Sequence, residues 1–316
     1  MPEVVQVESL RHAYGQRIAL SGVSFSVRRG ELFGLLGPNG GGKTTLFRIL
    51  TTLLPPTAGE ARICGCDVGT DRDNARRHLG VVFQSPSLDI YLTARENLRH
   101  AGHLYGQRGR ELESRIEARL ADVELMERAD EPVKNLSGGM RRRAEIAKGM
   151  LHDPDILILD EPSAGLDPSA RRDLWRRLQA LRESTGVTIL FTTHYLEEAD
   201  RCDRVVILDR GHVVVHGSPA DLKSRIGGEC LTIASPNCEQ LCAEIAAEMG
   251  CPARLVDGLI RIETADGPAL VARLMASHAD RIHSILLGKP TLDDVFVRET
   301  GHRLTYVTAS PAKGGE

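Results

Sequence analysis

The chain has 316 residues, of which 41% are hydrophobic, and a formal net charge of −3 from 40 basic and 43 acidic side chains. This length and hydrophobic content can supply the cores of one large domain and a smaller one, which excludes disorder over most of the chain. The charge balance gives no basis for nonspecific nucleic-acid binding, which needs a strongly basic surface, so we expect no nucleic-acid partner.

The sequence contains no apolar run near the roughly 20 residues that cross a bilayer, and Met1-Pro2-Glu3 does not begin a signal peptide. We therefore expect a soluble, cytosolic chain. Its seven cysteines are scattered and odd in number, which is typical of reduced thiols. The pairs Cys64 with Cys66 and Cys238 with Cys242 would allow a metal site, but no second pair follows either at zinc-finger spacing, which favours core packing.

A phosphate-binding loop is the first strong motif. It reads Gly37-Pro38-Asn39-Gly40-Gly41-Gly42-Lys43-Thr44, fits G-x-x-x-x-G-K-[ST], and lies between a predicted apolar strand, Leu32 to Leu36, and a helical pattern that starts at Thr45. Glycines let backbone N–H groups approach phosphate oxygens. Lys43 would neutralise the β- and γ-phosphates, and Thr44 would bind Mg²⁺. The full motif in this context disfavours a glycine-rich turn without a ligand.

A second anion site is predicted where Ser137-Gly138-Gly139 opens an amphipathic helix over Met140 to Leu151. A serine hydroxyl and free backbone N–H groups at a helix start can hold an anion, although an ordinary N-capped helix is the alternative. We interpret Arg141 to Arg143, in the same helix, as solvated side chains, and a specific anion or lipid role is the less favoured alternative.

Two acids follow a strand that is predicted to be buried on both faces. Ile156 to Leu159 is a continuous apolar run, and Asp160 and Glu161 come directly after it, at the edge where α/β sheets bind ligands. Two ordinary surface acids would be the simpler interpretation if the phosphate loop were absent.

The order of these motifs resembles that of ATP-binding cassette (ABC) proteins. Leu136 to Met140 is similar to their LSGGQ signature, with Met140 in place of the usual glutamine, and Gly41 replaces the usual alanine of the phosphate loop. The resemblance covers about the first 220 residues. It implies an α/β P-loop NTPase fold over residues 1–225, with a helical subdomain at about 86–155.

The resemblance also implies roles for residues around one bound ATP. Tyr14 would stack on adenine, and Gln84 would contact Mg²⁺ and water and sense a membrane partner. Asp160 would hold the Mg²⁺ hydration shell, Glu161 would orient and polarise the attacking water, and His194 would contact the γ-phosphate. The nucleotide ligands are therefore expected to be Tyr14, Gly37, Pro38, Asn39, Gly40, Gly41, Gly42, Lys43, Thr44 and Thr45.

The signature further implies that two copies share each ATP. In ABC proteins the signature binds the γ-phosphate held by the phosphate loop of the second copy. By this resemblance, Ser137, Gly138 and Gly139 would bind the γ-phosphate at the partner copy's Lys43 loop. Ser163 to Asp167 resembles the D-loop, so Asp167 would lie at the dimer interface and couple the two sites. We therefore expect a homodimer with composite nucleotide sites.

Residues 226–316 are predicted to form a small α+β domain. Strands and helices are expected in the order βαββαβ, which is compatible with a ferredoxin-like fold, with a hairpin at Asp257-Gly258. Thr291 and Asp294 have capping-box spacing before a last helix, and Lys313 to Glu316 is expected to fray. Leu292-Asp293-Asp294-Val295-Phe296 resembles the drug-exporter branch of daunorubicin-resistance type. A dimerisation or regulatory module and a packing appendage are equally compatible with this region.

The leading hypothesis is an ATPase subunit that works as a homodimer, peripheral to the cytoplasmic side of the cell membrane. It would drive a separately encoded integral membrane permease that exports a drug-like or lipid-like molecule. A soluble ABC protein acting on ribosomes or DNA is the rival hypothesis, and a regulatory module with a degraded ATPase is disfavoured by the presence of Lys43, Asp160 and Glu161. The substrate itself does not follow from this sequence.

Overall fold

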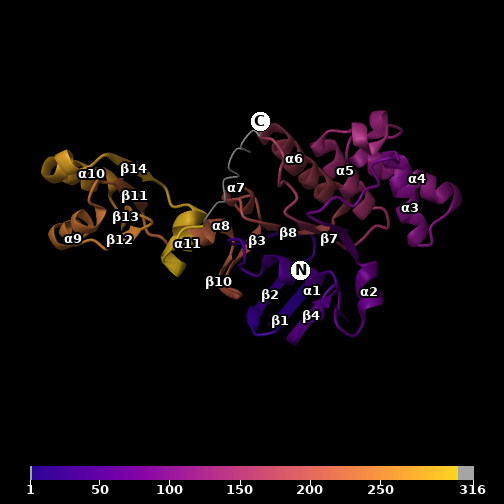
Figure 1. Ribbon diagram of the computed structural model, residues 1–316, viewed down its shortest axis with the longest axis horizontal. Coiled ribbons are helices and arrows are strands. Elements are labelled where there is room, and N and C mark those ends of the chain that lie inside the picture. Colours follow the sequence, from indigo (N-terminus) through magenta and orange to yellow (C-terminus); the bar gives the residue numbers. More distant parts are fainter. Residues whose placement is uncertain (1, 305–316) are drawn as a thin grey trace, which may run out of the picture.

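The structure is a computed structural model that describes residues 2–304 (Figure 1). The predicted frayed end, Lys313 to Glu316, lies outside the described residues. The central layer is a six-stranded sheet in the order β10-β9-β3-β8-β7-β6. Its strands are β3 (Leu32–Leu36), β6 (Leu79–Val82), β7 (Ile156–Asp160), β8 (Thr188–Thr193), β9 (Arg204–Asp209) and β10 (His212–Gly217). All neighbours pair in parallel except β10 with β9.

The parallel strands are apolar because both of their faces are covered. Every residue of β3, β7 and β8 is buried, as the continuous apolar runs predict. On one face lies an antiparallel sheet in the order β2-β1-β4-β5. It consists of β1 (Glu3–Tyr14), β2 (Arg17–Arg28), β4 (Ala58–Ile63) and β5 (Cys66–Asp67). Helix α1 (Lys43–Leu50) shares one hydrophobic cluster with both sheets, and α2 (Arg72–Arg77) connects β5 to β6.

The helical subdomain predicted at about 86–155 contains three helices, α3 (Ala94–Leu104), α4 (Gly109–Asp122) and α5 (Gly138–Gly149). Two short 3-10 turns, η1 (Met126–Arg128) and η2 (Val133–Asn135), precede α5. Helix α3 begins with a capping box formed by Thr93 and Glu96. The helices share a second cluster with the other face of the central sheet and with α6 (Pro168–Thr185), α7 (Leu196–Ala199) and α8 (Pro219–Ser224).

The C-terminal region forms a separate antiparallel sheet with its own hydrophobic cluster. Its elements are β11 (Glu229–Ala234), α9 (Cys238–Met249), β12 (Ala253–Val256), β13 (Leu259–Thr264), α10 (Gly267–His278), η3 (Ala279–Arg281) and β14 (Ser284–Gly288). The chain order βαββαβ is the predicted one, and the sheet order is β12-β13-β11-β14. Asp257 and Gly258 both have positive φ, as the hairpin signal predicts. This sheet and the helices α3 and α4 lie at opposite ends of the molecule (Figure 1).

The last helix of the described residues, α11 (Leu292–Thr300), returns to the first part of the chain. Its Leu292, Val295 and Phe296 belong to the same buried cluster as Val215 and Leu222 of β10 and α8. It starts with the predicted capping box of Thr291 and Asp294.

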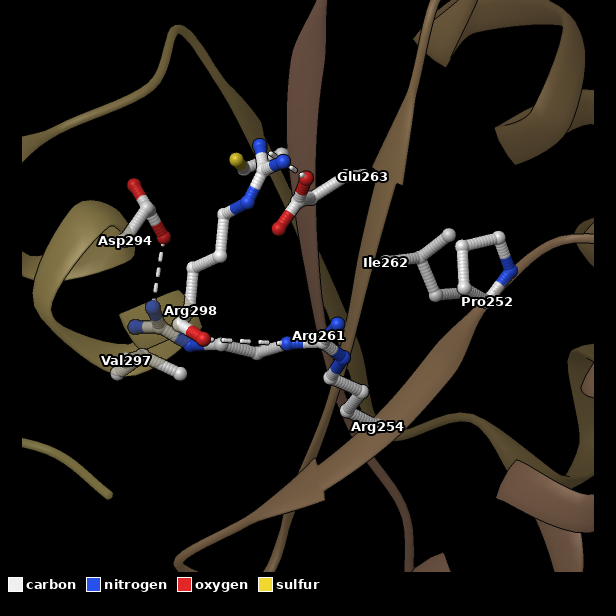
Figure 2. Close-up of a pocket in the computed structure, with 9 residues that line it drawn as sticks. Pro252, Arg254, Arg261, Ile262, Glu263, Asp294, Val297 and Arg298 are labelled. Atoms are coloured by element: carbon white, nitrogen blue, oxygen red, sulfur yellow. Dashed lines mark hydrogen bonds and ion pairs between the residues drawn. The ribbon is translucent and has the colours of Figure 1, made fainter. Parts of the chain in front are cut away.

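Ion pairs also join α11 to the C-terminal sheet, because Arg261 of β13 contacts Asp293 and Asp294. A pocket of about 200 Å³ lies between them, where Arg298 reaches toward Glu263 (Figure 2). It is lined by Cys230, Pro252, Arg254, Arg261, Ile262, Glu263, Asp294, Val297 and Arg298.

Candidate nucleotide-binding site

The phosphate loop turns between the end of β3 and the start of α1, and two of its glycines are required by sterics. A Cβ on Gly37 would lie 2.2 Å from the carbonyl oxygen of Leu208, and Gly42 adopts a φ of 106° at the N-cap of α1. Lys43 is buried, and its Nζ donates hydrogen bonds to the carbonyl oxygens of Gly37 (2.7 Å) and Pro38 (3.1 Å). Burial lowers the pKa of this ammonium group. The Lys43 ammonium group is thus held inside the loop in which it would bind phosphate.

Asp160 and Glu161 leave β7 with their positions fixed by one hydroxyl of the neighbouring strand β8. Thr192 Oγ1 donates to Asp160 Oδ1 (2.5 Å) and accepts from the backbone N–H of Glu161 (2.9 Å). Burial raises the pKa of the Asp160 carboxyl. The role of Thr192 was not predicted from the sequence, although its place in the strand next to β7 follows from the parallel sheet order.

Glu161 is the point where three predicted site residues meet. His194 Nδ1 lies 3.2 Å from Glu161 Oε1, Gln84 Nε2 donates to Oε2 (3.3 Å), and Lys43 Nζ lies 3.9 Å from Oε1. The hydrogen bond with His194 lowers the pKa of Glu161. Glu161 also has a positive φ of 44°, an uncommon conformation that is often found at functional sites.

A pocket of about 260 Å³ opens over the phosphate loop and collects the side chains expected around a nucleotide. It is lined by Tyr14, Arg17, Ile18, Ala19, Asn39, Gly40, Gly42, Lys43, Thr44, Thr45, Arg48 and Glu161. The Tyr14 ring is 44% exposed at the end of β1 and packs edge-on against His12. It can therefore receive a flat ring on its free side. Arg17 and Arg48 were not predicted from the sequence, and they add positive charge for an anionic ligand.

The signature residues are placed elsewhere in the same copy. Ser137 caps α5, accepting a hydrogen bond from the backbone N–H of Met140 (3.2 Å), and Asp167 caps α6 through the N–H groups of Ser169 and Ala170. Among the described residues that line the pocket over Lys43, none belongs to Ser137–Gly139 or is Asp167. One copy thus brings together the loop, the acids and the sensors, and leaves its signature helix start outside that pocket.

The interpretation of Arg141 to Arg143 as solvated side chains is wrong, because all three donate to backbone carbonyls. Arg141 binds the oxygens of Lys134 and Leu136, and Arg143 binds those of Val123 and Glu124. Arginine can satisfy several backbone carbonyls at once, because its planar guanidinium carries five N–H donors.

Of the three arginines, Arg142 contacts the segment that carries the site residue Gln84. Arg142 is buried and donates to the carbonyl oxygens of Phe83 (2.6 Å) and Gln84 (3.3 Å) and to Glu145 (2.8 Å). Glu145 in turn accepts from the N–H of Ser87 (2.8 Å), and its burial raises its pKa. The spacing of Arg142 and Glu145, three residues apart on one helix, was the only signal of this pair in the sequence.

A family model described as ABC transporter matches residues 20–164. The chain is 39% identical over 309 residues to a Nod factor export ATP-binding protein I of Ralstonia nicotianae, with 95% of each chain covered. It is 37% identical to the daunorubicin resistance ATP-binding protein DrrA2 of Streptomyces coeruleorubidus, with 98% of each covered.

Solved structures agree with this match. The chain resembles cbiO1 from Clostridium perfringens, described as part of the ABC transporter complex cbiONQ, with a TM-score of 0.65 and 26% identity over 79% of this chain and 97% of that one. It also resembles the ATP-binding cassette MJ0796, a dimeric post-hydrolysis state bound to ADP and Pi, with a TM-score of 0.60 and 30% identity, covering 68% and 98%. The chain therefore belongs to the family of ABC transporter ATP-binding proteins, and it is an ATPase.

Proposed function

We propose that two copies of this chain bind two ATP molecules with Mg²⁺ between them, and that closure of this dimer drives a separately encoded membrane permease in export. The observation that carries the proposal is the geometry around Glu161, where the phosphate-loop lysine, Gln84 and His194 meet at one carboxylate.

The residues near the loop fit a hard divalent cation. Thr44 offers a hydroxyl, Asp160 a carboxylate and Gln84 an amide oxygen, and oxygen ligands of this kind suit Mg²⁺. Asp160 Oδ1 is already bonded to Thr192, and Oδ2 is available to a bound water. When bound, Mg²⁺ would supply charge neutralisation on the β- and γ-phosphate oxygens.

The protein groups divide the remaining work. Lys43 and the loop N–H groups would bind and orient the phosphates, and Tyr14 would hold the adenine ring. Glu161, ionised because the hydrogen bond with His194 lowers its pKa, would accept a hydrogen bond from the attacking water and align it. Gln84 would fix the same water from the other side of the carboxylate.

A second copy would complete the site from outside. The start of α5 presents Ser137 and open N–H groups, and a Cβ on Gly138 would meet only Leu166, at 3.7 Å. Such a helix start attracts anions and is accessible to a γ-phosphate held by another copy. The dimeric state of the similar cassette MJ0796 supports this arrangement.

A groove of about 810 Å³ beside Gln84 supports docking of a permease. It is lined by Thr51, Arg76, Leu79, Val81, Phe83, Ser87, Asp89, Leu92, Asn97, His100, Ala101, Leu104, Tyr105, Lys148 and Gly149. Leu104 is 90% exposed and Tyr105 is 50% exposed at its rim. We assign the groove to a short amphipathic helix of the permease, since its lining combines apolar side chains with the basic or polar Arg76, His100 and Lys148. Within residues 2–304, none of the helices combines the length and the apolar character of a membrane span.

Export, the cytoplasmic side of the cell membrane and a drug-like or lipid-like cargo are proposed from the relatives, which include a Nod factor export protein and daunorubicin and linearmycin resistance proteins. Their coverage of nearly the whole chain extends the similarity through the C-terminal sheet.

The composite site is tested with Gly138→Asp, which puts a carboxylate where the partner's phosphate would lie. This variant alone should bind ATP with unchanged affinity, but it should fail to form the ATP-dependent dimer and should hydrolyse ATP at least tenfold more slowly. Mixed dimers with Lys43→Ala should recover one working site. Normal hydrolysis by Gly138→Asp homodimers would rule out the shared site.

The permease surface is tested by co-purification with the hydrophobic protein encoded by the adjacent gene. Leu104→Arg should abolish co-purification while leaving ATP binding intact. The control is Leu286→Arg, a change at a similarly exposed leucine on the distant β14. If both variants co-purify as wild type does, the groove is not the docking surface.

A further inference from the structure

Cys64, His78 and Asp155 gather at the edge of the central sheet opposite the nucleotide site. Cys64 lies in the turn between β4 and β5, while His78 and Asp155 directly precede β6 and β7. One possible ligand atom from each, the thiol sulfur, an imidazole nitrogen and a carboxylate oxygen, lies within 4.8 Å of the other two. The three residues are far apart in the sequence and none belongs to the ATP machinery.

The backbone fixes all three positions. Cys64 has a φ of 48° and donates its N–H to the carbonyl oxygen of Val4 (2.7 Å). The carbonyl oxygen of His78 accepts from Ile156 (3.0 Å), and that of Asp155 accepts from Thr188 (3.0 Å). The side chains therefore start from the ends of hydrogen-bonded strands, which is the preorganisation that a tight site needs.

Both oxygens of the Asp155 carboxylate have a partner, one in Arg29 and the other in the candidate ligand His78. Arg29 Nη1 donates to Oδ1 (2.6 Å), and His78 Nδ1 lies 2.6 Å from Oδ2. A hydrogen bond from an arginine to the oxygen that does not face the histidine is the kind of contact that orients a ligating carboxylate. The His78–Asp155 pair is already close, so placing an ion between them requires the two atoms to separate by under about 1 Å.

We propose that Cys64, His78 and Asp155 bind a borderline-soft divalent metal ion, Zn²⁺ in the first place. Thiolate sulfur, imidazole nitrogen and carboxylate oxygen are the ligands that zinc uses, and the thiolate disfavours Mg²⁺ and Ca²⁺. Three protein ligands leave a fourth tetrahedral position for water, and the side chains of His78 (36% exposed) and Asp155 (29%) give the ion a path from solvent.

The ion would join the antiparallel sheet to the central one. It would tie the β4–β5 turn to the starts of β6 and β7, the two strands whose far ends lead to Gln84 and Asp160. The site differs from the cysteine pair considered from the sequence, because the partners of Cys64 are a histidine and an aspartate and not Cys66.

Co²⁺ is the probe for the test, because a cobalt–thiolate bond gives a charge-transfer absorption that oxygen and nitrogen ligands do not. The full-length chain should bind one Co²⁺ with this band, and Zn²⁺ should displace it. Cys64→Ser should lose the band. His78→Gln and Asp155→Asn should weaken Co²⁺ affinity at least tenfold, and Arg29→Gln, which removes only the outer contact, by less.

Cys66→Ala is the matched control, since it removes a cysteine two residues away and should keep the band. Zn²⁺ should also raise the Tm of the wild type and of Cys66→Ala but not of Cys64→Ser, and circular dichroism shows whether each variant is folded. Absence of the band in the wild type, or its survival in folded Cys64→Ser, overturns the proposal.

Discussion

The guanidinium of Arg142 lies 2.6 Å from the carbonyl oxygen of Phe83, so the signature helix is hydrogen-bonded to the segment that delivers Gln84. The same side chain pairs with Glu145, and both are buried. A shift of Gln84 would therefore pull on α5, whose N-terminus presents Ser137. This contact joins the segment beside the groove to the helix that begins after Ser137.

Arg142→Met should reduce the free energy of unfolding by about 3–5 kcal/mol, because it leaves the buried carboxylate of Glu145 without its charged partner. Urea denaturation measures this change. The double variant Arg142→Met/Glu145→Leu should regain much of the stability without regaining the link to Phe83 and Gln84. A single variant as stable as the wild type would show that the pair is not structurally important.

Glu161→Gln should bind ATP and form the ATP-dependent dimer but hydrolyse ATP roughly 10²–10⁴-fold more slowly, since the amide cannot accept the proton of the attacking water. Phosphate release and size-exclusion chromatography with ATP check the two parts. The exposed Glu197→Gln on α7 is the control and should turn over normally. Wild-type turnover by Glu161→Gln would remove this residue from the role of base.

Asp160→Asn should make the nucleotide-free protein more stable near neutral pH while abolishing Mg²⁺-dependent hydrolysis. Burial raises the pKa of Asp160 in the folded chain above 3.8, the ordinary value that applies to the unfolded chain. At a pH between the unfolded-state pKa and the folded-state pKa, the folded chain therefore keeps the proton on Asp160 and the unfolded chain has lost it. The free energy of unfolding of the wild type therefore falls as pH rises through that range. The Asp160→Asn variant should not show this fall, because its amide does not titrate. Urea denaturation at a series of pH values from about 4 to 7 tests it, and parallel curves for the two proteins would contradict it.

Arg261→Met should destabilise the contact between α11 and the C-terminal sheet by about 1–3 kcal/mol, because Asp293 and Asp294 lose a largely buried hydrogen-bonding partner. The control is Lys289→Met, whose pair with Glu229 is exposed and should contribute under about 1 kcal/mol. Hydrogen exchange of α11 amides locates the effect. Equal protection of α11 in both variants would argue against this contact as the main tie.

The strand ends were predictable because apolar runs and parallel pairing place Gln84, Asp160 and His194 at one edge. The predicted strand over Glu229 to Ala234 agrees with β11, and the hairpin at Asp257-Gly258 is present. The antiparallel sheet of β1, β2, β4 and β5 was not predicted, since its long strands carry many exposed residues and register shifts that blur alternation.

Contacts between segments far apart in the sequence could not be predicted from the sequence either. The burial of Arg142 depends on where Phe83 and Gln84 come to lie, and the meeting of Cys64 with Asp155 depends on how the two sheets stack. A charged triplet in a helix carries no sign of such contacts by itself. The composition of Arg141 to Arg143 therefore indicated side chains in solvent. In the folded chain these side chains instead donate hydrogen bonds to backbone carbonyl oxygens.

The return of α11 to the buried cluster of Val215 and Leu222 makes the first structural unit discontinuous in sequence. The segment from β11 to β14 is then an insertion between α8 and α11. Truncation after α8 would strip the apolar side chains of Leu292 and Phe296 from that cluster and expose their neighbours to water. Exchange of the inserted sheet between relatives should accordingly use two junctions, one before β11 and one after β14, so that each recipient keeps its own last helix.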